Sequence, residues 1–322
     1  MKPDSTNSTD AEITTSETSV QHAPAGLNAA PRARVTRWLK RSAITLAALI
    51  ALVWSGASAF VYFKQGSIVY LPTRYLIKTP REAGLVFEDL RLPVKRASGS
   101  SEQIHLWWLP APAQAANGMS VLFLHGNARN MGAVSNADKV TTLARAGFNV
   151  LTLDYRGYGT SDGDAPYEAA LYEDTAVALE EFKRRAPDAS KRILHGHSMG
   201  GAVAIDLATK RPQDFIAAFI EATFTSMLDM STLNPVFRAL PIDTLLTERF
   251  ESARKIGSLK LPVLFIHGTH DARIPAAMSQ QLFGLAPQPK SMILVAGATH
   301  NNLHTFPDYA NAYRLLLEMA KK

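Results

Sequence analysis

The chain has 322 residues, of which 47% are hydrophobic and 19% charged. This balance excludes a disordered chain and leaves room for one large domain with an appendage. The formal net charge is +6, but five basic residues cluster just ahead of an apolar segment, and this placement favours membrane topology over nucleic-acid binding. They are Arg32, Arg34, Arg37, Lys40 and Arg41. Because the chain has no cysteine, disulfides, thiolate catalysis and cysteine-ligated metals are excluded.

The N-terminal segment is rich in Ser, Thr, Ala, Asn and Pro and carries few large apolar side chains. Such a composition buries too little surface to offset the entropy lost on ordering. We expect residues 1–41 to form a disordered basic tail.

Residues 42–63 contain no charged side chain, and as a helix they would cover the approximately 30 Å hydrocarbon core of a bilayer. We interpret them as a transmembrane anchor, since a core helix of this length without a polar face is unusual. A cleavable signal peptide is the main alternative, because Ala57-Ser58-Ala59 resembles a cleavage site. The positive-inside rule places the basic tail in the cytoplasm and residues 64–322 across the membrane, which is the periplasm if the source is a Gram-negative bacterium. Cleavage would instead release a secreted protein.

Short β-branched runs then alternate with longer amphipathic stretches, which predicts an α/β fold with a mostly parallel sheet of about eight strands and helices on both faces. No helical pattern separates the first two runs, so we expect them to pair antiparallel. The predicted strands are Val86–Leu92, Ile104–Leu109, Val121–Leu124, Val150–Leu153, Arg192–His195, Ala217–Ile220, Val263–Ile266 and Met292–Val295, and the clearest helices are Pro166–Arg185, Ser198–Lys210 and Pro275–Leu285.

The segment Gly196-His197-Ser198-Met199-Gly200 matches G-x-S-x-G between a predicted strand and a predicted helix. This sharp turn projects a serine at the carboxyl end of the sheet, and its glycines let the neighbouring backbone approach closely. The helix that follows supplies free N–H groups where an oxyanion forms. Ser198 is therefore the candidate nucleophile.

A second turn, His125-Gly126-Asn127, follows the third predicted strand. In acyl transfer, one oxyanion donor comes from such a loop and the other from the residue after the nucleophile. We expect these donors to be the backbone N–H groups of Asn127 and Met199, and we interpret His125 as a buried turn residue.

A general base must be a histidine, and the usual order of serine, acid and histidine along the chain eliminates most of the nine histidines. We favour His300 over His304 by its position. His300 follows the last predicted strand, whereas His304 lies closer to the terminal helix. Asp271 follows the penultimate strand and is the candidate for the acid that orients the imidazole. Asp243 is the alternative candidate for this acid.

Two further features at this edge carry weaker signals. The turn from Asp154 to Ser161 is glycine-spaced and aromatic, and we interpret it as structural. Glu221 ends the sixth predicted strand, and we expect its side chain to hydrogen-bond loop backbone.

Together these motifs resemble the α/β-hydrolase superfamily, and more narrowly its membrane-anchored, lysophospholipase-like α/β-hydrolase-domain proteins. The resemblance runs from about Phe63 to Phe306 and also includes Tyr70-Leu71-Pro72-Thr73-Arg74 and Glu221-Ala222-Thr223-Phe224. It implies hydrolysis of an ester, a thioester or occasionally an amide through an acyl-enzyme, with no metal or organic cofactor. Asn301-Asn302 departs from relatives that place an acidic residue close behind the histidine.

About forty residues separate Glu221 from Leu261, so a large cap domain is not expected. This segment is apolar, and Phe224 and Met227 are its candidate substrate-binding residues, although ordinary helix packing would give the same pattern. We expect a serine hydrolase of lipid-like or short acyl esters or thioesters on a Ser198, His300 and Asp271 triad. The alternatives are a peptidase or amidase of the same fold and a catalytically silent membrane scaffold.

Overall fold

The computed structural model describes residues 29–96 and 99–321. It divides into two compact units, one ending at Val53 and the other running from Trp54 onward. Helix α1 (Ala29–Val69) continues from the first unit into the second, and from Arg32 to Val69 it is long and apolar enough to cross a membrane. Residues 29–41 are thus helical rather than part of a disordered tail, since they hold good helix formers and their proline lies in the first turn. Residues 1–28 lie outside the described residues.

Eight strands in the second unit form one sheet in the order β10-β9-β8-β7-β4-β6-β3-β2. The five strand pairs between β10 and β6 are parallel, and the β6·β3 and β3·β2 pairs are antiparallel. The strands are β2 (Glu88–Lys95), β3 (Ser101–Leu109), β4 (Ser120–Leu124), β6 (Asn149–Asp154), β7 (Arg192–His197), β8 (Ala217–Glu221), β9 (Val263–Gly268) and β10 (Lys290–Val295). This confirms the eight predicted strands and the antiparallel pairing of the first two.

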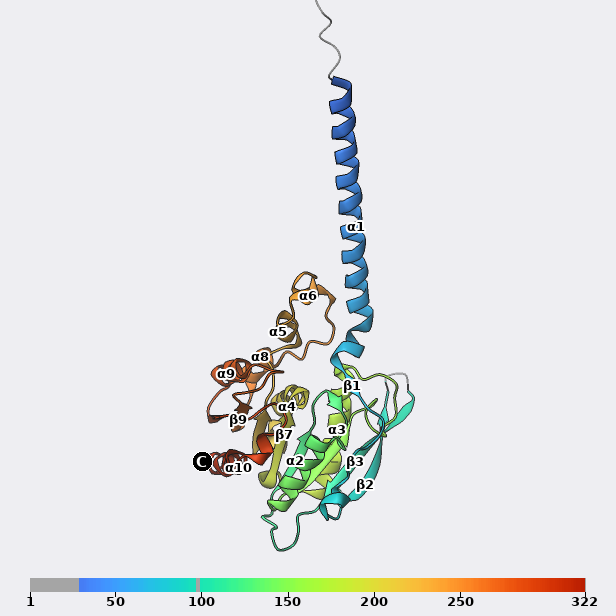
Figure 1. Ribbon diagram of the computed structural model, residues 1–322. Coiled ribbons are helices and arrows are strands. Elements are labelled where there is room, and N and C mark those ends of the chain that lie inside the picture. The colour runs from blue at the N-terminus through green and yellow to red at the C-terminus, as the bar shows by residue number, and fades with distance from the viewer. Residues whose placement is uncertain (1–28, 97–98, 322) are drawn as a thin grey trace, which may run out of the picture. The chain divides into compact units, whose positions relative to one another are not determined.

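Helices cover both faces of this sheet and create two hydrophobic cores (Figure 1). One core lies under α3 (Glu168–Arg185), α4 (Met199–Lys210) and α9 (Ala276–Leu285). The other lies under α2 (Val134–Arg145) and α10 (Pro307–Met319). The central strands β4, β6, β7, β8 and β9 are buried on both faces, which explains their mostly apolar sequences.

A small parallel pair that the sequence did not predict joins β1 (Leu71–Pro72) to β5 (Ala128–Arg129). It ties the chain just after α1 to the loop that follows β4. Short 3-10 helices complete the connections, namely η1 (Pro80–Ala83), η2 (Ala189–Lys191), η3 (Pro212–Asp214), η4 (Ile256–Ser258) and η5 (Leu303–Thr305).

Residues 222–262, here called the cap segment, connect β8 to β9. They form four short α-helices, α5 (Met227–Thr232), α6 (Pro235–Arg238), α7 (Ile242–Leu245) and α8 (Ser252–Lys255), together with η4, and no large lid, as the sequence predicts. The last turns of α1 pack on this segment. The Trp54 indole donates to the Ala239 carbonyl at 2.8 Å, and Val61 is buried against Ile242 and Leu246.

Candidate active site

Ser198 sits in a strained turn between β7 and α4, with φ 58° and ψ −124°. This turn requires glycine two residues before and two residues after the serine. A Cβ on Gly196 would lie 2.2 Å from the Gly200 carbonyl oxygen, and one on Gly200 would lie 2.1 Å from that of Leu124. The strain holds the Ser198 hydroxyl at the carboxyl edge of the sheet.

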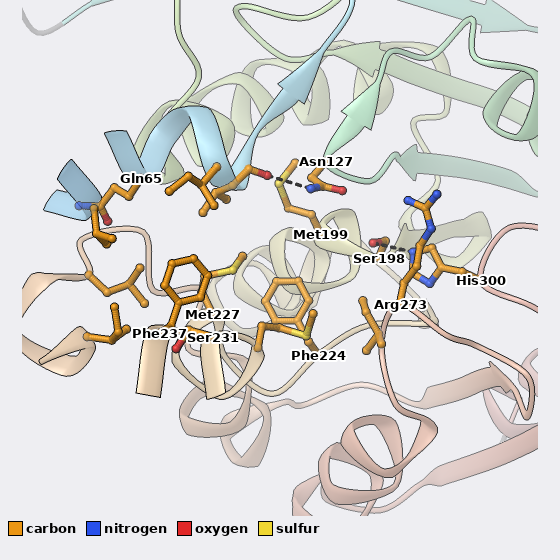
Figure 2. Close-up of a pocket in the computed structure, with 17 residues that line it drawn as sticks. Gln65, Asn127, Ser198, Met199, Phe224, Met227, Ser231, Phe237, Arg273 and His300 are labelled. Carbon is orange, nitrogen blue, oxygen red and sulfur yellow. Dashed lines mark hydrogen bonds between the residues drawn. The ribbon is translucent and has the colours of Figure 1, made fainter. Parts of the chain in front are cut away.

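The predicted serine, histidine and aspartate form one hydrogen-bonded chain. The Ser198 hydroxyl lies 3.0 Å from Nε2 of His300, and Nδ1 of His300 lies 2.7 Å from Oδ2 of Asp271. Figure 2 shows the first of these bonds. With the carboxylate accepting from Nδ1–H, Nε2 is free to accept the serine proton. This geometry fits general-base activation of Ser198.

Asp271 is held by more than His300. Its Oδ1 accepts the backbone N–H groups of Arg273 and Ile274 at 2.8 and 3.0 Å, and Nε2 of His267 lies 3.1 Å from its Oδ2. Burial raises the pKa of this carboxyl, but the hydrogen bonds with His267 and His300 outweigh burial and hold its pKa well below the ordinary value. Asp271 is therefore ionised. The sequence did not predict the contribution of His267.

The two predicted oxyanion donors flank the nucleophile. Met199 is the first residue of α4, and within the described part of the chain neither its N–H nor that of Asn127 has an acceptor. The loop before Asn127 touches the nucleophile, since a Cβ on Gly126 would lie 3.0 Å from that of Ser198. The Asn127 side chain donates to the Val69 carbonyl at 2.8 Å, so the end of α1 holds this loop (Figure 2).

Behind the site lies a fully buried charged cluster. Nζ of Lys139 is 2.9 Å from the Glu221 carboxylate, which also lies 2.9 Å from Nε2 of His195. Burial raises the pKa of Glu221, but Lys139 and the neighbouring histidines outweigh it and hold this pKa well below the ordinary value. The Glu221 side chain thus pairs with charged and aromatic partners rather than with loop backbone as expected. Its backbone carbonyl is what accepts the Ser198 N–H, at 2.8 Å.

His197 connects this cluster to the base. Its Nε2 donates to the His300 carbonyl at 3.0 Å, and the two rings are 5.0 Å apart. Burial, followed by the charge of Lys139, holds the pKa of His197 well below its ordinary value. A neutral ring therefore supports the loop that carries His300. Neither Lys139 nor His197 was predicted to support the site. In the sequence Lys139 looks like any lysine of an amphipathic helix, and His197 occupies a variable position of the G-x-S-x-G motif.

A hollow of about 410 Å³ opens beside Ser198 and is mainly apolar. Phe224 and Met227 line it, as predicted, and Figure 2 shows them with Phe237 along one wall. The opposite wall comes from the end of α1, partly from the predicted anchor and partly from the residues just after it, and neither was predicted to line the site (Figure 2). Its residues in the hollow are Val61, Gln65, Ile68 and Val69.

The residues considered and set aside lie elsewhere. Asp243 pairs with Arg249 at 2.8 Å on the surface, so it does not replace Asp271. His304 lies on η5 and has no hydrogen bond to Ser198. His125 is buried beside Asp154, and Tyr158 of the turn donates to the Asn127 carbonyl at 2.8 Å. These contacts support a structural role for His125 and for the turn from Asp154 to Ser161.

Comparison with known proteins finds a family match and several relatives. Residues 116–254 match the family described as serine aminopeptidase, S33. An uncharacterized protein of Mycobacterium tuberculosis is 32% identical over 82% of this chain and 90% of its own length. Protein bem46 of Schizosaccharomyces pombe is 32% identical over 78% and 81%.

The fold is also found among solved structures. The esterase Pf2001 of Pyrococcus furiosus has a TM-score of 0.62 at 17% identity, and the match covers 78% of this chain and 97% of the esterase chain.

A further sequence relative is WAV2 of Arabidopsis thaliana, an α/β-hydrolase domain-containing protein that is 28% identical over 73% of this chain and 79% of its own length. With the sheet order, the strained serine turn and these relatives, the chain belongs to the α/β-hydrolase superfamily, and its place there supports a hydrolase.

Proposed function

We propose that this protein is a serine hydrolase that cleaves carboxylic ester or thioester bonds of lipid-like or short acyl substrates. His300 accepts the Ser198 proton as the hydroxyl attacks the carbonyl carbon, and the N–H groups of Asn127 and Met199 stabilise the oxyanion. The imidazolium then protonates the leaving group, Asp271 stabilises its charge, and water releases the acyl group by the reverse proton path.

One observation supports this proposal above the others. An apolar hollow of about 410 Å³ opens beside the hydrogen-bonded Ser198, His300 and Asp271. The serine–histidine and histidine–aspartate distances in this group are 3.0 and 2.7 Å. This volume is within the range of small-molecule sites. An acyl chain buried there is removed from water, and each methylene contributes about 0.8 kcal/mol.

A peptidase or amidase is the second candidate, because the matched family is named for serine aminopeptidases and one solved likeness is an acylaminoacyl peptidase. An aminopeptidase has to bind the ammonium group of its substrate, which calls for a carboxylate. The residues lining the hollow include no Asp or Glu and do include Arg273. This favours an ester over a peptide with a free amino terminus.

For the membrane we propose that residues 42–63 anchor the protein, with the basic tail in the cytoplasm and the hydrolase unit on the opposite side, its cap segment against the bilayer because Trp54 and Val61 of the anchor contact it. A retained helix fits the contacts of α1 better than a cleaved signal peptide. Ser58 is buried and Trp54 bonds to Ala239, so cleavage near Ala59 would remove residues that belong to the hydrolase unit.

The test is a substrate profile of the full chain in detergent. Acyl esters, thioesters and aminoacyl amides with acyl chains from two to sixteen carbons are compared, with Ser198→Ala as control. We expect turnover of esters that rises to a medium chain length and a loss of at least about 10³-fold in Ser198→Ala. Amide turnover exceeding that of the matched ester would favour the second candidate, and turnover of no acyl compound would contradict both.

A further inference from the structure

One buried lysine of the hydrolase unit has no part in the proposed mechanism. Lys139 lies on α2, and it is the only lysine among the described residues whose side chain is buried. Its Nζ lies 2.9 Å from Oε1 of Glu221, and both side chains are inaccessible to solvent. A buried ion pair is often no more stabilising than well-packed apolar side chains of similar volume. Its place behind the active site therefore calls for another explanation.

The Glu221 carboxylate has more than one group that could balance its charge. Besides Lys139, Nε2 of His195 lies 2.9 Å from Oε2 of this carboxylate. The charge of Glu221 also acts on His197, two residues further along β7. A buried carboxylate has to be paired with a positive charge, and the lysine and the two imidazoles of β7 compete to supply it.

The location of that positive charge matters because His197 lies against the base. Its Nε2 donates to the His300 carbonyl at 3.0 Å, and the two rings are 5.0 Å apart. His300 becomes an imidazolium each time it takes up the Ser198 proton. A second imidazolium at this distance would repel it and slow the proton transfer by about tenfold to a hundredfold. A charge on Lys139 instead forms a neutral pair with Glu221.

The electrostatic effects agree with this division of charge. Burial is the first cause that lowers the pKa of His195, His197 and His304, and Lys139 lowers all three further. Burial also lowers the pKa of Lys139, but Glu221 opposes this. The titratable groups that face this cluster from other elements are His300 after β10, Asp271 after β9, His304 of η5, and Tyr309 and Tyr313 of α10.

We propose that Lys139 is a positioning residue for catalysis: it carries the charge that balances Glu221, and so leaves both histidines of β7 neutral beside the base. The inference rests on the proposed function, from which it takes only the nucleophile Ser198 and the base His300. A neutral His197 keeps an N–H for the His300 carbonyl and adds no charge where the imidazolium forms.

Lys139→Met tests the role of the charge, because methionine is also unbranched and cannot be protonated. The unpaired Glu221 then draws a proton onto an imidazole of β7. With an octanoyl ester and the full chain in detergent, kcat should be about tenfold to a hundredfold below wild type at pH 7. By pH 9, where the imidazole has released its proton, this deficit should shrink by at least about threefold. KM should stay near the wild-type value, since Lys139 does not line the apolar hollow.

Two further variants provide the comparison. The double variant Lys139→Met/Glu221→Gln removes both charges, so kcat should return to within about fivefold of wild type, with a wild-type pH profile. Lys210→Met removes an exposed ion pair of α4, in which Nζ lies 2.8 Å from Oδ2 of Asp206, and it should leave kcat unchanged at both pH values. The rate of fluorophosphonate labelling of Ser198, measured in the same buffers, should show the same ratios.

A deficit that is the same at pH 7 and pH 9, or a double variant no more active than Lys139→Met, would overturn the proposal and leave Lys139 a packing residue. If Lys139→Met does not fold, the double variant decides: a kcat within about fivefold of wild type supports charge balance, and a larger loss contradicts it. The labelling rates give the same comparison without ester turnover. Absence of turnover with intact labelling therefore refutes the proposed function alone.

Discussion

Gly200 shows how closely single residues set the geometry around Ser198. Its Cα faces the end of β4, and a Cβ there would meet the carbonyl oxygens of Leu124 at 2.1 Å and His125 at 2.6 Å. Those carbonyls belong to the strand and turn that carry Asn127. A displacement at Gly200 therefore moves an oxyanion donor as well as the nucleophile.

We expect Gly200→Ala to reduce kcat by at least about 10²-fold, the loss associated with one oxyanion donor, and to lower stability by about 1–3 kcal/mol through overpacking. Ester turnover and thermal unfolding measure the two effects. Gly284→Ala is the control, because its added Cβ meets nothing within 4 Å on α9. It should retain activity and gain about 0.5–1 kcal/mol. Equal effects of the two variants would contradict this role of Gly200.

The buried histidines make stability depend on pH. Burial is the largest cause that lowers the pKa of His195, His197 and His304 below the ordinary value of 6.5. Above pH 6.5 these rings are neutral in both the folded and the unfolded chain. Below it the unfolded chain binds protons that the folded chain excludes, so stability falls by up to about 1.4 kcal/mol per pH unit for each histidine.

Chemical denaturation between pH 8 and pH 5 tests this expectation. Burial raises the pKa of Asp174 to about 7, so this carboxyl by itself adds stability as the pH falls through that value. Below about pH 6.5 the three histidines should outweigh it and lower the free energy of unfolding. His197→Gln, which keeps a donor for the His300 carbonyl, should reduce the slope by about one proton. A free energy that rises from pH 6.5 to pH 5, in the wild type and equally in His197→Gln, would contradict the exclusion of protons from the buried histidines.

At the scale of elements, the end of α1 does more than tether the hydrolase unit. Val61, Gln65, Ile68 and Val69 form one wall of the apolar hollow, and Gln65 accepts the Thr247 N–H at 2.7 Å. The helix thus helps to form the acyl site together with the cap segment. A hydrolase fragment should consequently begin no later than Trp54, where the compact unit starts.

We expect Val61→Trp to narrow the apolar hollow and shift the preference toward shorter acyl chains. The ratio of kcat/KM for octanoyl to acetyl esters should fall about tenfold or more, because lost methylene burial costs about 0.8 kcal/mol per group. Phe63→Trp is the control, since Phe63 is 78% exposed on the same helix and lies outside the hollow. If both variants keep the wild-type chain-length profile, α1 does not form an acyl wall.

The elements differ in how well the sequence predicts them. Most of the eight strands could be found because strands buried between two layers are apolar runs bounded by turns. Ser198 follows such a strand directly, and Asp271 comes three residues after another. The wall formed by α1 could not be predicted, since a helix that is apolar on all sides does not indicate which side packs against the hydrolase unit. The β1·β5 pair is too short to leave a pattern, and Lys139 reaches Glu221 from a helix far away in sequence.

At the scale of the whole molecule, the chain combines a membrane-compatible helix with a hydrolase unit. The absence of cysteine allows a direct test of the proposed topology with single introduced cysteines. Thr6→Cys lies in the tail and Ala116→Cys in an exposed loop of the hydrolase unit. We expect a membrane-impermeant maleimide to label the second in intact spheroplasts and the first only after lysis. Labelling of both before lysis, or release of the hydrolase unit into the medium, would contradict a retained anchor.

The central claim is that Ser198 is an activated nucleophile, and covalent labelling by a fluorophosphonate probe tests it most directly. The full chain in detergent is incubated with the probe, and the modified residue is identified by mass spectrometry. The account predicts stoichiometric labelling at Ser198, none in Ser198→Ala, and labelling slowed by at least about 10³-fold in His300→Ala. An unlabelled wild type, or undiminished labelling of Ser198→Ala, would contradict it.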